Sequence, residues 1–424
     1  MVKPIKILII GNGFGGVYTL RNLHKLFDKN KQIELSMVGE KDHFLFTPLL
    51  HEVATGGINP VNIIEPIRKV LGCCLKNFYL GKAEFINFEN HTVKVNDTTV
   101  NYDYLILAPG AETNFYDTKG AEEYSFTLKN IEDAIKIKHH CIKQVEKASQ
   151  IKDREERKRM LKFVIVGGGP TGVELAAELE ELIKESFSHY YTKEVMEDIS
   201  IVLIQKTGEL IPSFGEKAQK KSLEVLQKKG IEVMLNNEVI EVADSYIMVG
   251  ENPKGKITPY GAGKKIFTNT VIWVAGVKPR ELKFNQEVLK SPDGRLIVNE
   301  YLQLEDQKEV FAIGDVAFFE QNKRPLPALA QVAEKEAKAV VKNIELLIKN
   351  QRPERFIYKN SGNLLSIGRW MAIGEISNFT FSGHITWWLW RTIYLFKLLS
   401  WRKKIRVALD WTINLFSPRD ISQI

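Results

Sequence analysis

Two glycine-rich turns lie far apart in this chain, and each directly follows an apolar segment. Residues 11–16 read GNGFGG after the run IKILII, and residues 167–172 read GGGPTG after the run FVIV. Such runs are typical of buried parallel strands, and a glycine-rich turn between strand and helix holds a pyrophosphate on free backbone N–H groups. One such turn is weak evidence, but two copies in the same context indicate that the chain binds two dinucleotides. Two nucleotides in one chain suggest electron transfer between them.

The residue that ends the following strand differs between the two turns. After the first turn, segment 33–39 ends at Glu40, whose carboxylate can accept hydrogen bonds from both ribose hydroxyls of an adenosine. After the second turn, segment 201–204 ends at Gln205, which is neutral. The missing charge removes both an attraction for NADH and a barrier against NADPH. The sequence therefore leaves the preference between these two donors open.

Further strands that end in small residues mark the limits of each nucleotide unit. Segments 104–110 (YLILAPG) and 271–277 (VIWVAGV) echo one another, and segment 310–315 ends in Gly-Asp. We therefore predict an α/β fold with two Rossmann-like dinucleotide-binding domains, the second inserted in the first. The predicted domains are residues 1–115 and 286–350 for the first, residues 116–285 for the second, and residues 351–424 for a C-terminal region.

These motifs resemble those of the two-dinucleotide flavoprotein disulfide reductase superfamily, in which FAD occupies the first unit and NAD(P)H the second. Within that superfamily, residues 46–56 (FTPLLHEVATG) are similar to a motif of the type II NADH:quinone oxidoreductases, the single-subunit respiratory NADH dehydrogenases. Residues 169–175 (GPTGVEL) and 330–333 (AQVA) are similar to two more motifs of that family. The resemblance covers nearly the whole chain.

The resemblance also implies roles for single residues. It places Thr47 near FAD, Glu174 where the nicotinamide and quinone regions meet, Gln331 beside the isoalloxazine ring, and Asp315 on the flavin's ribityl chain. The family usually continues with a second Gln and a Gly, whereas this chain has Lys335 and Ala337, so the quinone contacts are left open. The predicted catalytic residues are Glu174 and Gln331, the predicted quinone residues are Gln331 and Lys335, and no metal site is expected. The predicted noncovalent FAD site comprises Gly11, Gly13, Gly15, Gly16, Glu40, Thr47, Ala108, Gly110, Asp315 and Gln331, and the predicted NAD(P)H site comprises Gly167, Gly169, Gly172, Glu174, Gln205 and Gly276.

The C-terminal residues 385–416 interleave aromatic with basic side chains. A membrane-spanning helix needs about 20 predominantly apolar residues, and Arg391 and Lys397 interrupt the first candidate. We therefore predict a C-terminal amphipathic helical membrane anchor that lies on the bilayer surface, assisted by the net charge of +7. A helix pair that covers a core or forms a dimer interface is the alternative, and it explains the aromatic residues but not the basic ones. The stripe predicted to face the lipid is Ile405, Ala408, Leu409, Ile413 and Phe416.

Location and partners follow from the same patterns. The first predicted strand begins almost at the amino terminus, so we expect no signal peptide and a peripheral protein on the cytoplasmic face of the inner (cell) membrane. The expected partners are a membrane quinone and the lipid surface, with no nucleic acid, and a homodimer is left open. Without a spanning segment the chain would have no structural route for pumping protons.

The sequence thus predicts a peripheral NAD(P)H:quinone oxidoreductase that passes a hydride from NADH to FAD and two electrons on to a quinone. A disulfide reductase, a thiol-based oxidase or a sulfide:quinone oxidoreductase would need redox cysteines beside the flavin. The only cysteines are Cys73, Cys74 and Cys141, which form no C-x-x-C pair and no metal-ligand spacing. The role of the first two is left open. A redox-sensing flavoprotein with slow turnover is the alternative outside enzymes, and the sequence does not identify the quinone.

Overall fold

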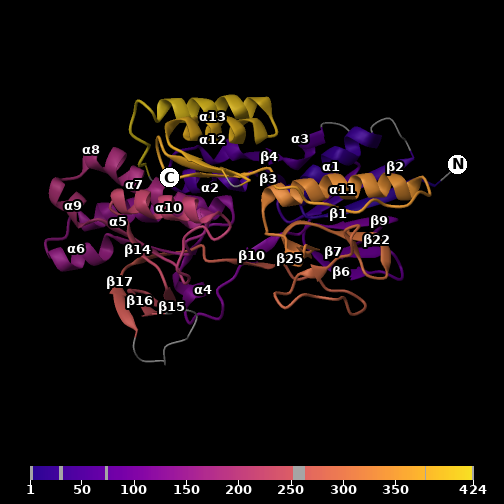
Figure 1. Ribbon diagram of the computed structural model, residues 1–424, viewed down its shortest axis with the longest axis horizontal. Helices are drawn as coiled ribbons and strands as arrows, with labels where there is room; N and C mark the ends of the chain where they lie inside the picture. Colours follow the sequence, from indigo (N-terminus) through magenta and orange to yellow (C-terminus); the bar gives the residue numbers. More distant parts are fainter. Residues whose placement is uncertain (1–2, 28–31, 72–74, 252–262, 378, 423–424) are drawn as a thin grey trace. The chain divides into compact units, whose positions relative to one another are not determined.

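A computed structural model describes residues 3–27, 32–71, 75–251, 263–377 and 379–422 of the 424-residue chain. The chain forms two compact units, each assembled from separated segments (Figure 1). The first unit comprises Met1–Leu45, Ile64–Glu112 and Val277–Lys359, and the second comprises Phe46–Ile63, Thr113–Gly276 and Asn360–Ile424.

The first unit is built on a six-stranded sheet with the strand order β21-β22-β9-β1-β2-β5. Strand β1 pairs in parallel with both β2 and β9, and β9 pairs in parallel with β22, so the carboxyl ends of these four strands meet at one edge. Helices α1 and α11 pack against one another beside this sheet (Figure 1). The bounds are β1 (Ile5–Ile10), α1 (Phe14–Phe27), β2 (Ile33–Gly39), β5 (Asn77–Leu80), β9 (Tyr104–Leu107), β21 (Gln303–Leu304), β22 (Gln307–Ala312) and α11 (Ala330–Ile348).

Short elements complete the first unit. They include a two-stranded ribbon, a three-stranded meander and the 3₁₀ turn η5 that directly follows β22. Their bounds are β3 (His43–Leu45), β4 (Ile64–Pro66), α3 (Ile67–Leu71), β6 (Ala83–Asn87), β7 (Thr92–Val95), β8 (Thr98–Asn101), β19 (Val277–Pro279), β20 (Leu296–Ile297), η5 (Gly314–Val316), β23 (Ala317–Phe318), β24 (Glu320–Gln321) and β25 (Arg324–Pro325). Strand β10 (Ala111–Thr113) begins in the first unit and ends at Thr113, where the chain enters the second unit.

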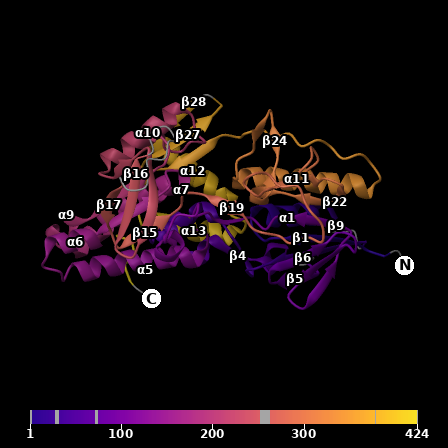
Figure 2. The same ribbon diagram turned by 90° about the horizontal axis from the view of Figure 1, so that it is seen from below.

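The second unit repeats the same plan with a five-stranded sheet of order β11-β18-β12-β13-β14, and all its pairings are parallel. Figure 2 shows helices α5, α7 and α10 around this unit. The predicted pair of Rossmann-like units is confirmed, since the second sheet is made from residues between the segments of the first. The bounds are β11 (Phe126–Thr127), α5 (Ile131–Ala148), α6 (Arg154–Met160), β12 (Lys162–Val166), α7 (Pro170–Glu181), β13 (Ser200–Ile204), α10 (Glu216–Lys228), β14 (Glu232–Met234) and β18 (Thr270–Trp273).

Two helices of the second unit begin with a side-chain N-cap. The side chain of Asn130 accepts a hydrogen bond from the backbone N–H of Asp133 and begins α5, while Asp153 accepts from two N–H groups and begins α6. A turn of π-helix, η3 (Leu182–Phe187), extends α7 and leads to two short helices. The remaining elements are α4 (Ala121–Tyr124), α8 (Ser188–Tyr190), α9 (Lys193–Asp198) and the antiparallel strands β15 (Asn237–Ala243), β16 (Tyr246–Glu251) and β17 (Lys264–Phe267).

The C-terminal residues belong to the second unit, together with the short segment around α2 (Leu50–Ala54). A meander of β26 (Asn363–Ser366), β27 (Ala372–Ile376) and β28 (Phe379–Ser382) leads to α12 (His384–Lys397) and α13 (Trp401–Ile413), which lie side by side (Figure 1). Two 3₁₀ turns, η1 (Thr47–Leu49) and η2 (Pro60–Ile63), flank α2. No helix in the described ranges is long and apolar enough to cross a membrane.

Candidate functional site

The first glycine turn joins β1 to α1 and has room for no side chain at its two ends. Gly11 has φ +103°, and a Cβ atom built on it would lie 1.9 Å from the carbonyl oxygen of Ala108. A Cβ atom on Gly16 would lie 1.8 Å from the carbonyl oxygen of Gly11. Gly13 has nothing within 4 Å of its Cβ position, so the space before the start of α1 is open. This is the cradle that a pyrophosphate requires.

Glu40 lies at the end of β2, at the same edge of the sheet. Its Oε1 atom is 2.5 Å from Nη1 of Arg280, whose backbone N–H donates to the carbonyl oxygen of Gly110. The side chain of Asn12 donates to two carbonyl groups that follow Glu40, at 2.8 and 2.7 Å, and so ties the turn to the strand end. The first unit thus brings the predicted ribose carboxylate close to the predicted glycine turn, where a cationic partner holds it.

Asp315 lies in η5, immediately after β22. The preceding Gly314 has φ +70°, and its N–H donates to Oε2 of Glu336 in α11 at 2.6 Å. A Cβ atom on Gly314 would lie 3.4 Å from Cβ of Ala333, so η5 packs on the first turns of α11, where Gln331 lies. Burial raises the pKa of Glu336 to about 7. Sequence reasoning missed Glu336, although its position inside an apolar helix face was the available signal.

Three other predicted residues have different surroundings. The ammonium of Lys335 donates to the carbonyl oxygen of Lys359 and lies 5.0 Å from the ring centre of Tyr358. Thr47 begins η1 in the second unit, where it is exposed. Gly15 packs closely instead, because its Cβ position is 3.2 Å from Cβ of Ala108.

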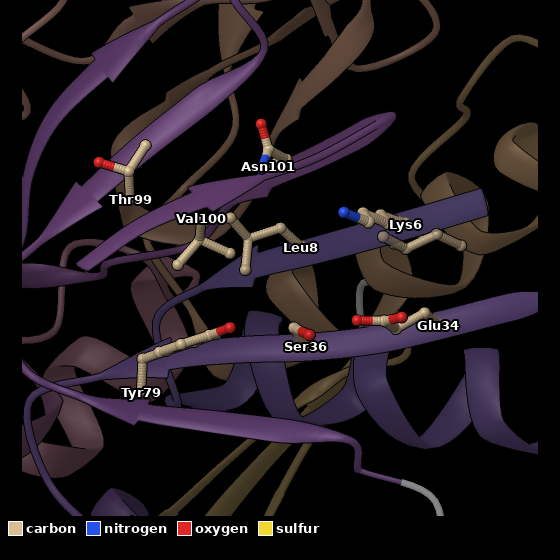
Figure 3. A pocket seen from close by; sticks show the side chains of 9 residues that line it. Lys6, Leu8, Glu34, Ser36, Tyr79, Thr99, Val100 and Asn101 are labelled. Atoms are coloured by element: carbon tan, nitrogen blue, oxygen red, sulfur yellow. The ribbon is translucent and has the colours of Figure 1, made fainter. Parts of the chain in front are cut away.

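A polar pocket elsewhere in the first unit is separate from the cradle. Figure 3 shows it beside the first half of β1, whereas the glycine turn follows the last residue of that strand. Its polar lining includes the side chains of Glu34, Ser36, Tyr79 and Asn101. Nothing in this lining adds to the nucleotide site.

The second glycine turn repeats the geometry of the first. Gly167 has φ +113°, and its Cβ position is 2.5 Å from Cα of Ala275, while that of Gly172 is 1.8 Å from the carbonyl oxygen of Gly167. Gly169 has open space in front of it and lies directly before α7. Gly276 follows β18, where a Cβ atom would lie 2.2 Å from the Tyr116 hydroxyl. The second cradle also fits a pyrophosphate.

Gln205 does not extend freely from its strand end. Its Oε1 atom accepts a hydrogen bond from the backbone N–H of Gly168 at 2.8 Å, and its Nε2 atom donates to the Thr207 hydroxyl at 2.7 Å. The side chain therefore folds back onto the glycine turn. Lys206, beside it, pairs with Glu238 at 2.7 Å.

Glu174 belongs to a buried acidic cluster in the second unit. It lies on α7, with Glu178 and Glu181 one and two turns later, and α7 packs on α2, which carries His51 and Glu52. The Nδ1 atom of His51 is 3.7 Å from Oε2 of Glu174. The backbone N–H of Ser366 donates to Oε1 of Glu174 at 3.3 Å, and the indole N–H of Trp411 donates to Oε2 of Glu52 at 2.6 Å.

Arg419, near the end of the chain, supplies the charge that this cluster needs. Its guanidinium donates to Oε2 of Glu178 at 2.7 Å, to Oε2 of Glu181 at 3.2 Å and to the Thr55 hydroxyl at 2.9 Å. Its side chain is 10% exposed, so the ion pair is shielded from water. Sequence reasoning missed all of these groups except Glu174. The spacing of the three glutamates on one helix face was visible, but such a stripe is usually a solvated surface.

Burial and charge divide the cluster into neutral and ionised groups. Burial raises the pKa of Glu174 well above its ordinary value and that of Glu52 to about 8, and it lowers the pKa of His51 to about 4. Burial also acts to raise the pKa of Glu178, but Arg419 and other neighbours bring it below its ordinary value. At neutral pH, Glu174 and Glu52 therefore hold protons, His51 is uncharged, and Glu178 is the anion.

Comparison with known proteins identifies the family. Residues 5–337 match the model of the pyridine nucleotide-disulphide oxidoreductases, and residues 360–420 match the NDH2 C-terminal domain. A probable NADH dehydrogenase of Dictyostelium discoideum is 33% identical over 100% of this chain and 92% of its own length. The chain belongs to the type II NADH dehydrogenases. The type II NADH:quinone oxidoreductase Ndh of Mycobacterium tuberculosis is 29% identical over 98% of this chain and 89% of its own.

Solved structures of low sequence identity support the fold. The structure of NDH2 from Plasmodium falciparum in complex with NADH matches with a TM-score of 0.90 and 23% identity, covering 99% of this chain and 100% of that one. The sulfide:quinone oxidoreductase of Aquifex aeolicus matches with a TM-score of 0.76 and 18% identity, covering 98% and 96%. Because both share the architecture, the family assignment depends on the sequence matches.

The cysteines bear on the thiol-dependent alternatives. Cys141 is buried in α5, and burial raises the pKa of its thiol to about 12, so it is not a reactive thiolate at neutral pH. Cys73 and Cys74 lie outside the described residues.

Proposed function

We propose that this chain oxidises NADH and reduces a quinone by way of noncovalently bound FAD, without pumping protons. The main observation that supports this proposal is the pair of matched glycine cradles. Each has closed ends and open space in front of its middle glycine, which is Gly13 in the first and Gly169 in the second. When bound, FAD accepts a hydride and passes on two electrons, which is chemistry that no side chain supplies. The protein's part is to bind, orient and handle protons.

The first cradle is proposed as the FAD site. The N–H groups at the start of α1 would hold the pyrophosphate, and Glu40 would accept hydrogen bonds from the ribose hydroxyls. Asp315, just after β22, is suited to the ribityl chain, because η5 holds it at the carboxyl edge of the sheet. The second cradle is proposed for NADH, with Gln205 closing the turn beside the ribose.

The acceptor side is proposed from single residues. Gln331, in the first turn of α11, can donate an amide N–H to a quinone oxygen, and Lys335 lies one helical turn further on. Glu174 is proposed to orient the donor and acceptor and to give a proton to the quinone.

The outward face of the C-terminal helices supports binding to a lipid surface. Trp387, Trp390 and Trp411 are buried within the second unit, whereas an apolar stripe on α13 faces outward, with Ile405, Leu409 and Ile413 between 51% and 58% exposed. Lone exposed apolar residues are ordinary, but a contiguous stripe marks an interaction surface. We propose that this stripe, on the cytoplasmic side of the cell membrane, holds the enzyme peripherally.

An anaerobic titration tests the function directly. Purified protein receives NADH and then a short-chain quinone, while flavin absorbance is recorded. Full bleaching followed by full recovery, and steady-state rates of roughly tens per second, would support the enzyme. A single slow reduction per flavin would instead support a redox sensor. If quinone did not restore the absorbance of the bleached flavin, the proposal that a quinone is the electron acceptor would be wrong.

Membrane binding is tested with one matched pair of variants. Leu409 in α13 and Leu289 in the first unit are equally exposed, at 54% each, so Leu409→Glu and Leu289→Glu carry the same change at different surfaces. Leu409→Glu should weaken vesicle binding about tenfold, because the glutamate would enter the lipid interface. Neutralising Arg402, Lys404 and Arg406 should weaken binding to anionic vesicles more than to neutral ones. If the protein self-associates and does not bind vesicles, the stripe on α13 instead contacts a second copy of the chain.

A further inference from the structure

His51 occupies an unusual position for a buried histidine. It is 3% exposed, its Nδ1 atom is 3.7 Å from Oε2 of Glu174, and the charges of Glu178 and Arg419 act on its ring. Its Nε2 atom is buried and has no hydrogen-bond partner among the described residues. A satisfied structural histidine uses both ring nitrogens. By contrast His140, half-buried and with its pKa also lowered to about 4 by burial, has its Nε2 atom 2.8 Å from the Thr270 hydroxyl.

Quinone reduction requires a supply of protons at the site, and a buried histidine beside Glu174 can provide it. A turnover of NADH, one proton and quinone gives NAD⁺ and quinol, so the hydride brings two electrons and one proton, and the second proton comes from water. The proton donor to the quinone must be recharged after each turnover. Glu174 lies within a buried cluster, which excludes bulk water from direct contact with most of its surface.

We propose that His51 delivers protons to Glu174 during quinone reduction, and that Glu178, held by Arg419 of the C-terminal segment, is the positioning charge that supports this transfer. This inference rests on the proposed function, because only an acceptor that takes up protons needs the relay. It assigns the C-terminal segment a part in the reaction in addition to surface binding.

The O–H bond of the protonated Glu174 breaks as an O–H bond forms on the quinone oxygen. A proton that originates from water then binds Nε2 of the neutral His51, the resulting imidazolium gives its Nδ1 proton to the Glu174 carboxylate, and rotation of the ring restores the Nδ1–H form for the next turnover. The separation of 3.7 Å is longer than a hydrogen bond, so the proton crosses when the ring tilts toward the carboxylate.

Glu178 supports the transfer through its charge. A proton arriving on His51 makes the ring transiently cationic, and the Glu178 carboxylate favours that cation. Arg419 keeps Glu178 ionised and fixes its side chain, while donating from the same guanidinium to Glu181. The charged or titratable groups that act on Glu178 are His51, Glu52, Glu174, Glu181, Arg391 and Arg419.

The test compares two acceptors in His51→Phe. Ferricyanide takes electrons without protons, whereas a short-chain quinone needs both, so the ratio of the two rates isolates proton delivery from flavin reduction. We expect the quinone-to-ferricyanide ratio to fall at least tenfold in His51→Phe and to stay within twofold of wild type in the control His140→Phe. An unchanged ratio in flavin-replete His51→Phe overturns the proposal. His51→Gln, which remains polar but cannot pass a proton between two ring nitrogens, should show the same fall and serves if the Phe variant does not fold.

Arg419→Gln tests the positioning charge. Loss of the guanidinium raises the pKa of Glu178, so the acid limb of the quinone pH profile should move up by at least one pH unit, while the ferricyanide profile does not move. Arg157→Gln is the control, because Arg157 makes a comparable shielded pair with Asp198 at 2.7 Å in the same unit. Superimposable quinone profiles for Arg419→Gln and wild type overturn this part. Failure of the proposed function would give a different result from failure of the proton relay, because the wild-type protein itself would then reduce ferricyanide but no quinone.

Discussion

The two nucleotide turns have the same backbone but different strand ends. In both, the first glycine has a strongly positive φ, of +103° in Gly11 and +113° in Gly167, and the last glycine lies against the carbonyl oxygen of the first. Beyond the turns the resemblance stops. Glu40 points a charge outward to Arg280, whereas Gln205 bonds to the turn itself through the N–H of Gly168.

The difference shows which part of a dinucleotide site is generic. Closed glycine ends and a helix start bind any pyrophosphate, so they place a nucleotide without choosing it. The side chain at the end of the next strand meets the ribose, where NADH and NADPH differ. A charged group in the first unit and a neutral one in the second predict strict binding in one cradle and tolerant binding in the other.

The largest expected effects come from Gly16→Ala and Gly172→Ala. In each variant the new Cβ atom would lie 1.8 Å from a carbonyl oxygen, so the turn must move, at a cost of about 1–3 kcal/mol or more. Gly16→Ala should purify without flavin. Gly172→Ala should retain FAD that dithionite reduces but NADH does not.

Gly13→Ala and Gly169→Ala provide the control for this pair. Both Cβ atoms would enter open space, so the fold should be retained while the cofactor is crowded out. If Gly16→Ala or Gly172→Ala alone lost both FAD and NADH binding, the two cradles would not bind separate nucleotides.

Glu40→Ala and Asp315→Leu should come next in size. Each removes a hydrogen bond from a charged group to FAD, worth roughly 1.5–3 kcal/mol, so FAD should bind tenfold or more weakly. Flavin content after gel filtration measures this. Glu112→Ala is the matched control, because Glu112 is another exposed carboxylate of the first unit paired with a cation, Lys278, at 3.3 Å. Full flavin content in both test variants would mean that neither carboxylate contacts the cofactor.

Sequence was sufficient for the parts of the site that depend on backbone. The apolar run before the first turn corresponds to β1, and both glycine turns lie between strand and helix, because those conformations are dictated by local residue type. The orientation of Gln205 was beyond reach, since an amide turns toward whichever donor is nearest in the folded chain. The same holds for Arg419, which reaches Glu178 across more than two hundred residues of sequence.

The C-terminal helices show the limit of pattern reading in another way. The aromatic and basic residues predicted a surface element, with a core-covering helix pair as the alternative. In the structure α12 and α13 bury three tryptophans, while four of the five residues of the predicted stripe are exposed and Ala408 is half-buried. The buried tryptophans agree with the core-covering alternative, whereas lipid binding by the exposed residues stays a prediction. Composition gave both sets of residues, but only tertiary packing separates them.

Gln205→Glu sharpens the comparison by giving the second cradle the charge of the first. The new carboxylate can still accept from the N–H of Gly168, while its charge attracts the NADH ribose and repels the extra phosphate of NADPH. The NADH-to-NADPH ratio of kcat/KM should rise about tenfold, since a charged hydrogen bond is worth on the order of 1.5 kcal/mol. Initial rates with both donors at fixed quinone measure it. An unaltered ratio would show that this side chain never faces the ribose.

The smallest expected effect separates the two units by their response to pH. Burial raises the pKa of Glu336 in the first unit to about 7 and that of Glu52 in the second to about 8. A carboxyl group whose folded pKa is raised stabilises the fold fully below its unfolded pKa, and that contribution is lost as pH rises through the folded value. The first unit should therefore lose about 1 kcal/mol between pH 6 and pH 8, and the second should lose a similar amount about one pH unit higher.

Separate probes can follow these two losses in the whole protein. All seven tryptophans lie in the second unit, so their fluorescence reports its unfolding, whereas flavin release reports the first. Glu336→Gln mimics the protonated side chain, so it should flatten the pH dependence of flavin release and leave the tryptophan transition as in wild type. Glu52→Gln should do the reverse. If either variant altered both transitions equally, the two units would unfold as one, and the pH response could not be divided between Glu336 and Glu52.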